Sequence, residues 1–364
     1  IGTIYDLKDT VQAPDRYLGA NIGKWQLEVD REAWYMSSKD YVKNSVRIVK
    51  DMLAKEGKTL PTGKKASRPT IKDYRPELDV SPELGREGTS RYQQLIGMLR
   101  WAAELGRIDF LYELSALSSH LALPREGHLE SVYNIFGYLD KHTESHMVFD
   151  DIVPQLCLDN FPTTDWSKSI YGDVEEETPQ FAPEALGRPV QMTCFVDASH
   201  GTDKLTRRSH TGYIIFLNNA PIAWFSKRQN TVETSTFGAE LVALRIATEK
   251  VKDLRIKLRL FGIPVEGPTY MLCDNESVTK STSNVEATLN KKHQAICWHA
   301  VREAAAAGWI RIGWEPTGTN IADLFTKNLD NERRRMLLRM IFPKYQPDEE
   351  KNRQPDGGKD QPSG

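Results

Sequence analysis

The segment CFVDASHG, residues 194–201, decides how this chain is interpreted. It begins as an apolar strand and ends on one carboxylate, Asp197, which small and polar residues follow. An isolated charge in a protein interior carries a large desolvation penalty, so Asp197 must be paired, hydrated or bound to a metal. The rest of the chain has to supply its partners.

Strand-like runs follow one another in the region around Asp197. They cover residues 191–197, 211–217, 221–227, 269–273 and 309–314. The turn LNNAP joins the second run to the third, so the first three strands form an antiparallel meander. The last two follow helical segments, and crossovers of this kind produce parallel neighbours. We predict an α/β fold, a mixed five-stranded sheet with flanking helices.

Three further acids fall where this fold would bring them to Asp197. Asp274 ends the fourth strand, and sites in open α/β sheets form at the carboxyl ends of parallel strands. Glu240 lies in the first turn of a long helix that Ser235 or Thr236 would cap. Asp323 follows the last strand and opens another helix.

Four carboxylates at one place repel one another, so they converge only where cations hold them. Hard oxygen ligands suit Mg²⁺ or Mn²⁺. Two such ions can activate a water and stabilise the leaving oxygen of a phosphodiester. The sequence therefore predicts a nuclease site with two Mg²⁺ (or Mn²⁺) ions.

Composition sets the broad class. The chain has 364 residues, a formal net charge of −2 and 39 % hydrophobic residues, which is typical of a soluble globular protein. No apolar run approaches the roughly 18 residues of a membrane span, so we expect no membrane partner. The four cysteines form no CxxC pair and are interpreted as reduced thiols of an intracellular protein. Because the chain begins with Ile1, we interpret it as a fragment or processed product.

The chain divides by composition into five parts. Residues 1–60 mix strand-like pieces with one helix, and 61–150 hold a loop and three helical runs. Residues 151–190 have eight acidic and two basic residues and few apolar anchors, so we expect a solvated linker. The predicted sheet occupies 191–330, and 331–364 would form a helix and a disordered tail.

A family resemblance rests on six motifs in residues 193–329. They are CFVDAS, RRSHTGYIIFLNNAPIAWFSKRQ, ETSTFGAELVAL, LCDNES, KKHQAICWHAVRE and NIADLFTKNL. In this order they resemble the ribonuclease H domain of copia-type long-terminal-repeat retrotransposons. The resemblance implies a ribonuclease H-like fold and cleavage of the RNA strand of RNA:DNA hybrids. It implies that the catalytic and metal-binding residues are Asp197, Glu240, Asp274 and Asp323.

Residues upstream resemble the end of the reverse transcriptase of the same pol polyprotein. RYLGANI is similar to a strand after the polymerase active site, and residues 89–120 to the thumb and connecting helices. The Tyr-x-Asp-Asp motif of the polymerase is absent, so we expect no polymerase activity from this chain alone. The resemblance implies the remainder of the polyprotein as a partner and an intracellular, cytoplasmic location, in a virus-like particle. The oligomeric state stays open.

Contacts to the hybrid are expected from two groups of residues. Lys227, Arg228, Gln229 and Asn230 follow the third strand, and Lys250 and Arg255 belong to basic residues on the far part of the Glu240 helix. Such cations position a duplex through its phosphates. The alternative is an ordinary solvated helix face.

Two histidines and one missing histidine also bear on the site. His200 is interpreted as a loop residue and His293 as a structural one, and the loop EPTGTN before Asp323 lacks the histidine of many ribonucleases H. Two other functions stay open. One is a DNA-cutting enzyme of the same fold, such as an integrase or transposase core. The other is a catalytically silent connection module that only binds nucleic acid, which would need lost carboxylates.

Overall fold

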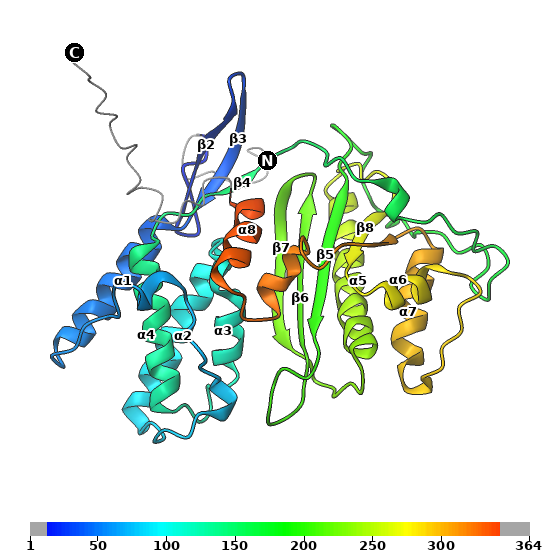
Figure 1. Cartoon of the computed structure of the whole chain (residues 1–364). Helices are drawn as coiled ribbons and strands as arrows, with labels where there is room; N and C mark the ends of the chain where they lie inside the picture. Colours follow the sequence, from blue (N-terminus) through cyan, green and yellow to red (C-terminus); the bar gives the residue numbers. More distant parts are fainter. Residues whose placement is uncertain (1–12, 343–364) are drawn as a thin grey trace, which may run out of the picture.

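The computed structural model describes residues 13–342 as two joined parts (Figure 1). The first part contains a small sheet and a group of helices, and the second is built on a five-stranded sheet. The predicted disordered tail after residue 342 lies outside the described residues. So do the first residues of the predicted 1–60 segment.

The small sheet is antiparallel throughout, in the order β1-β2-β3-β4. Its strands are Arg16–Tyr17 (β1), Ala20–Glu28 (β2), Arg31–Ser37 (β3) and Met147–Phe149 (β4). β4 comes from a distant part of the chain and pairs with β3, so it brings the end of the helical region back to the first hairpin.

Four helices pack on one another beside this sheet. They are Lys39–Ala54 (α1), Arg86–Glu104 (α2), Leu111–Ser118 (α3) and Glu126–Lys141 (α4). In α1 the buried residues Val42, Val46, Val49 and Leu53 recur at helical spacing and face the shared core. The helix predicted in residues 1–60 and the three helical runs predicted in 61–150 are confirmed.

The large sheet has the order β7-β6-β5-β8-β9. Its strands are Met192–Ser199 (β5), His210–Leu217 (β6), Ala220–Arg228 (β7), Thr269–Cys273 (β8) and Ile310–Trp314 (β9). β5, β6 and β7 form the antiparallel meander, whereas β5, β8 and β9 run parallel. The predicted mixed five-stranded α/β sheet is confirmed, with every strand within two residues of its expected ends.

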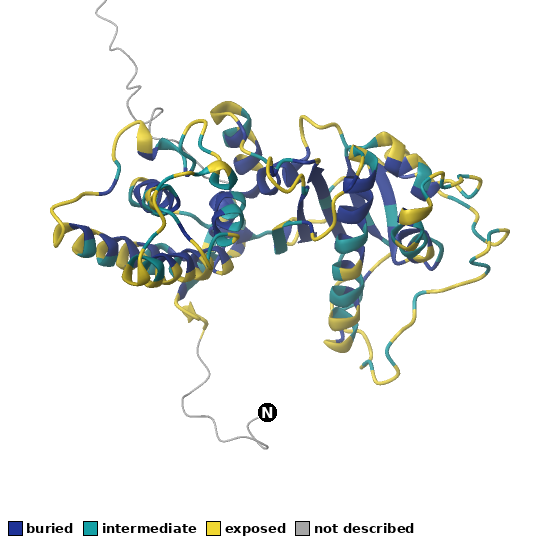
Figure 2. Ribbon diagram, turned by 90° about the horizontal axis from the view of Figure 1, so that it is seen from below, coloured by how far each residue is buried: buried dark blue, intermediate teal, exposed yellow. Residues whose placement is uncertain are grey.

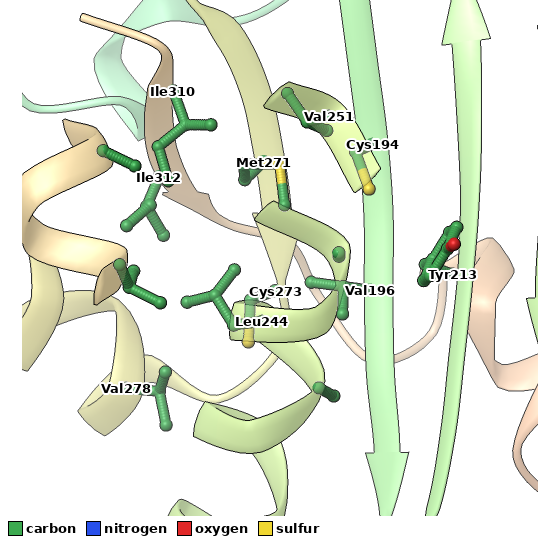
Figure 3. Close-up of a cluster of buried hydrophobic side chains, with 14 of the residues drawn as sticks. Cys194, Val196, Tyr213, Leu244, Val251, Met271, Cys273, Val278, Ile310 and Ile312 are labelled. Atoms are coloured by element: carbon green, nitrogen blue, oxygen red, sulfur yellow. The ribbon is translucent and has the colours of Figure 1, made fainter. Parts of the chain in front are cut away.

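Three helices cover one face of this sheet, and a 3₁₀ helix with one further α-helix covers the other. Thr236–Leu260 (α5), Glu276–Ser283 (α6) and Ala295–Ala306 (α7) contribute to the core shown in Figure 3. Cys194 and Cys273 lie in that core as buried free thiols, and Cys157 and Cys297 are also free. The opposite face carries the 3₁₀ helix Ile321–Phe325 (η6) and the helix Asn331–Ile341 (α8).

The two parts share a buried boundary. One apolar cluster joins Ile108 and Met147 of the first part to Ile214 of β6 and Leu337 of α8. Arg334 of α8 also pairs with Glu113 of α3 at 3.3 Å, and both side chains are buried. In Figure 1, α3 and α8 lie beside β7, on the side of α1, α2 and α4. Figure 2 shows buried ribbon in the middle of the molecule, where the two parts meet. The sheet and the helical part therefore form one continuous body.

The acidic segment 151–190 is largely irregular and, in line with the expectation of few apolar anchors, buries one apolar side chain, Phe161. Phe161 packs edge-on against Tyr270 of β8 and fills the space above Gly313 of β9. Glu176 binds Arg255 and Arg259 of α5. The segment is thus held on the sheet and α5 by aromatic packing and ion pairs. The domain limits at 151 and 191 stay predictions.

Candidate active site

Asp197 and Asp274 lie at the same edge of the sheet because their strands are parallel neighbours. β5 pairs with β8 in a register that places Val196 opposite Cys273, and each aspartate follows directly. Asp197 is buried and Asp274 is half-buried. The indole Nε1 of Trp314 in β9 donates a 3.2 Å hydrogen bond to the Asp274 carbonyl and fixes the backbone there.

Glu240 reaches this edge from the first turn of α5. Ser235 is the N-cap, and its hydroxyl accepts a hydrogen bond from the Gly238 amide at 3.2 Å, so the predicted cap is confirmed. The Glu240 side chain is buried, and its Oε2 has no hydrogen-bond partner among residues 13–342. An unpaired buried carboxylate oxygen is costly, so this atom requires a partner outside the described chain.

Asp323 is carried by η6, which is fastened directly to β5. The Asn320 amide donates to the Val196 carbonyl at 3.0 Å, and its oxygen caps η6 by accepting from the Ala322 amide at 3.1 Å. Gly212 of β6 permits the close approach, because a Cβ there would lie 2.7 Å from the side chains of Phe325 and Thr326. Asp323 is fully buried as a result.

The four predicted carboxylates come together around Asp274. Ligand atoms of Asp197, Asp274 and Asp323 all lie within 4.8 Å of one another. Ligand atoms of Glu240, Cys273 and Asp274 form a second group with the same spacing. Burial raises the pKa of the Cys273 thiol well above its ordinary value, and nearby Glu240 acts in the same direction. The oxygens are therefore the chemically available ligands.

Two cations and a hydroxyl complete the cluster, and sequence reasoning missed all three. Lys327 Nζ lies 2.5 Å from Asp323 Oδ1 and 3.5 Å from Asp197 Oδ2. Arg333 binds the other oxygen of Asp323, and the Thr326 hydroxyl donates to Asp197. The signal for Lys327 was its position four residues after Asp323 in NIADLFTKNL, which brings the two side chains to one side of a helical turn.

The site disfavours ionisation of its acids. Burial raises the pKa of Asp197 to about 6, with Lys327 opposing and Asp323 adding to the rise. Burial, followed by the charges of Asp197 and Asp274, raises the pKa of Glu240 well above its ordinary value. The pKa of Asp274 is raised by burial and by Asp197. Burial alone would lower the pKa of Lys327, but Asp197 and Asp323 outweigh it and raise that pKa.

These residues fit a divalent cation. The cluster offers several carboxylate oxygens within coordination reach, including the partnerless Glu240 Oε2. Oxygen ligands of this kind are those that Mg²⁺ and Mn²⁺ prefer. A bound cation would offset the repulsion that the raised pKa values reflect.

Known proteins with similar sequences include transposon Pol polyproteins. The chain is 25 % identical over 283 residues to the retrovirus-related Pol polyprotein from transposon RE1 of Arabidopsis thaliana, covering 78 % of this chain and 17 % of that protein. It is 24 % identical over 325 residues to that from transposon TNT 1-94 of Nicotiana tabacum, covering 89 % of this chain and 21 % of that protein. The chain is therefore similar in sequence to transposon Pol polyproteins. It spans about a fifth of their length, and no family model matches it.

Solved structures similar to this chain include ribonucleases H. The N-terminal RNase H domain of rv2228c from Mycobacterium tuberculosis has a TM-score of 0.30 at 13 % identity, covering 41 % of this chain and 97 % of that one. LC11-RNase H1, solved in complex with an RNA/DNA hybrid, has a TM-score of 0.30 at 15 % identity, covering 37 % and 94 %. At these scores the fold assignment rests on the strand order and pairing described above.

Two of the predicted hybrid contacts are corrected by their burial. Gln229 lies inside the protein, where its amide donates to the Thr211 hydroxyl and to the Ala239 carbonyl, both at 2.9 Å. Arg255 is 1 % exposed and binds Glu176. Both side chains hold elements of the fold together, and neither is exposed enough to contact a bound duplex.

The other four predicted contacts lie at the surface. Lys227 and Asn230 are exposed, Arg228 is half-buried and pairs with Asp203, and Lys250 binds Asp253 at 2.9 Å. Their role as nucleic-acid contacts stays a prediction.

The structure adds a basic groove that the sequence did not reveal. A cavity of about 520 Å³ lies between α2, α3 and edge strand β7. Its charged and polar lining includes four basic residues and one acidic residue: Arg100 and Glu104 of α2, with Arg208, Lys227, Arg228 and Asn230. Arg100, Arg208 and Lys227 have no acidic partner among the described residues. Only tertiary packing brings Arg100 to the sheet, so no local pattern could have placed it there.

The two histidines lie outside the carboxylate cluster. His200 is exposed, and its Nε2 is 2.9 Å from the Glu233 carbonyl. His293 is also exposed, with Nε2 3.8 Å from Glu233 Oε2. The expected loop position of His200 is confirmed. In the described part of the chain, no helix combines the length and apolar character needed to cross a bilayer.

Proposed function

We propose that this chain carries the ribonuclease H of a transposon Pol polyprotein and hydrolyses the RNA strand of RNA:DNA hybrids. The observation that carries the proposal is the convergence of four carboxylates from β5, α5, the end of β8 and η6. The order of the six motifs in residues 193–329 and the kinship with Pol polyproteins support the same conclusion.

In this proposal Asp197, Glu240, Asp274 and Asp323 hold two Mg²⁺ or Mn²⁺ ions. The ions, when bound, activate a water and stabilise the leaving oxygen of the phosphodiester. The chain supplies the alignment of the ligands: the β5–β8 register sets Asp197 beside Asp274, the Ser235 cap sets Glu240, and Asn320 sets the segment of Asp323.

The residues upstream of the sheet would be the end of the reverse transcriptase, with the remainder of the polyprotein as their partner. We place the activity in the cytoplasm, within the particle of the element. The packed boundary between α3, α8 and β6 supports a model in which both parts act as one body on the same duplex.

Cleavage of three labelled duplexes of one sequence tests the proposal: an RNA:DNA hybrid, double-stranded DNA and double-stranded RNA. With Mg²⁺, the full chain should cut the RNA strand of the hybrid and neither of the other duplexes, and EDTA should abolish the reaction. Cutting of double-stranded DNA would favour an integrase-like enzyme. Binding of the hybrid without any cleavage would favour the silent connection module.

A further inference from the structure

Lys327 occupies an unusual place in the carboxylate cluster. Its ammonium spans two different acids, at 2.5 Å from Asp323 Oδ1 and 3.5 Å from Asp197 Oδ2. Those two acids belong to the set whose ligand atoms lie within 4.8 Å of one another and of Asp274. A single positive charge that bridges two of the three acids stands where a bridging cation would also bind.

The formal charge of the cluster limits how readily a second divalent ion can bind there. With Lys327 and Arg333 paired to the cluster, four ionised carboxylates retain a formal charge of −2. One divalent ion neutralises that charge, so a second ion would have to enter a site that is already neutral. Charges this close interact strongly where burial lowers the dielectric constant.

The contacts of Arg333 and Lys327 indicate which of the two can leave the cluster. Arg333 is fixed by two acceptors, Asp323 and the Thr317 carbonyl. Lys327 has acidic contacts only, is a third exposed, and also lines a cavity of about 400 Å³ between α3 and the loop around Thr70. Glu113 lines the same cavity, and its buried Oε2 has no hydrogen-bond partner among residues 13–342. The lysine side chain therefore has room to move away from the cluster, into a cavity that Glu113, the partner of Arg334, also lines.

We propose that Lys327 competes with the second divalent ion for the Asp197–Asp323 side of the site, so that the two ions bind with unequal affinity. This inference rests on the proposed function, because it assumes that the carboxylates bind metal. The first ion binds beside Glu240 and Asp274, where no cation of the described chain forms an ion pair. The second binds only as the Lys327 ammonium withdraws, which makes the fully loaded site dependent on the metal concentration.

Titration of the full chain with Mn²⁺ tests the inference directly, because electron paramagnetic resonance reports free Mn²⁺ without any substrate. The wild-type chain should bind one ion tightly and a second weakly. Lys327→Met removes the charge at similar length and should strengthen the weaker binding constant on the order of tenfold. Lys327→Arg keeps the charge and should leave the second ion weak. Lys55→Met, which changes the exposed lysine that follows α1 as its C-cap, is the matched control and should behave as wild type.

Melting in EDTA provides a second readout. Lys327→Met should have a lower melting temperature than the wild type, since the carboxylates lose a counter-charge. Addition of Mn²⁺ should raise its melting temperature by more than it raises that of the wild type. If Lys327→Met does not fold, Lys327→Gln carries both measurements. An unchanged or weakened second constant in the neutral variants would overturn the inference while leaving the proposed function intact. A wild-type chain that binds no Mn²⁺ would instead contradict the proposed function itself.

Discussion

The charge of Asp197 depends on what surrounds its carboxylate. The residue is 1 % exposed, and burial together with Asp323 keeps its pKa near 6 in spite of Lys327. An unfolded chain would ionise the same group near 3.8. Folding therefore favours the protonated acid, and a bound divalent ion would reverse that preference.

Without metal, this preference should make the free energy of unfolding depend on pH. Because the folded chain binds the Asp197 proton more tightly than the unfolded chain, the stabilisation is complete below pH 3.8. It is lost as the pH rises through about 6. Relative to Asp197→Asn, the wild type should lose at most about 3 kcal/mol of unfolding free energy across that window. Urea unfolding in EDTA at a series of pH values measures the difference. Parallel profiles for the two proteins would mean that Asp197 has the same pKa in the folded and the unfolded chain.

The 3₁₀ helix η6 depends on a close contact with the sheet. It carries Asp323 and lies directly on β6, where the absence of a side chain at Gly212 leaves space for Phe325 and Thr326. The Asn320 side chain fixes the same segment to β5. The fourth carboxylate is therefore positioned by packing on the sheet and not by a strand end.

Gly212→Ala should disturb both stability and activity. The new Cβ would lie 2.7 Å from Phe325 Cβ and 3.1 Å from the Ala322 carbonyl, so η6 must shift. Overpacking of this kind costs about 1–3 kcal/mol, and displacement of Asp323 should reduce hybrid cleavage more than hybrid binding. Gly97→Ala in α2 is the control, because nothing lies within 4 Å of its added Cβ. Equal melting temperatures and cleavage rates in both variants would refute the role given to this contact.

The elements also indicate what a sequence can and cannot predict. Strand ends were predictable because turns such as LNNAP and the acids after apolar runs are local signals, and the Ser235 cap followed from its own helix. The docking of Phe161 on Tyr270 was not predictable, nor was the burial of Arg255 against Glu176. Each joins residues that are about 80 or more positions apart, and only the folded chain brings them together.

At the scale of the whole molecule, the helical part and the sheet share one surface. The groove between α2, α3 and β7 lies at the edge of the large sheet. Ser226 of β7 pairs with Gly212 of β6, which in turn pairs with Asp197 of β5. Neighbouring strands are about 4.8 Å apart, which places the backbone of Ser226 about 10 Å from that of Asp197, with the groove next to Ser226. A duplex bound at the site can therefore reach the cations of both parts.

Neutralising the groove should weaken binding and its dependence on salt. With a catalytically inactive chain, the combined change Arg100→Ala, Arg208→Ala and Lys227→Ala should lower hybrid affinity. The slope of log K against log salt should become shallower by up to about 0.9 for each phosphate that the protein no longer neutralises. Binding measured by fluorescence anisotropy across a salt series, with Lys55→Ala as control, gives both quantities. If the triple variant matches the control in affinity and slope, the groove is not a phosphate site.

Asp274→Asn is the decisive variant for the proposed hydrolytic metal site, because Asp274 belongs to both ligand groups. The variant keeps the size of the side chain and removes one charge. In single-turnover cleavage of a labelled RNA:DNA hybrid at saturating Mg²⁺, its rate should fall at least about a hundredfold, with hybrid binding retained. Asp159→Asn, in the exposed acidic segment, should cleave as the wild type does. Cleavage by Asp274→Asn within a few-fold of the wild type would contradict the account.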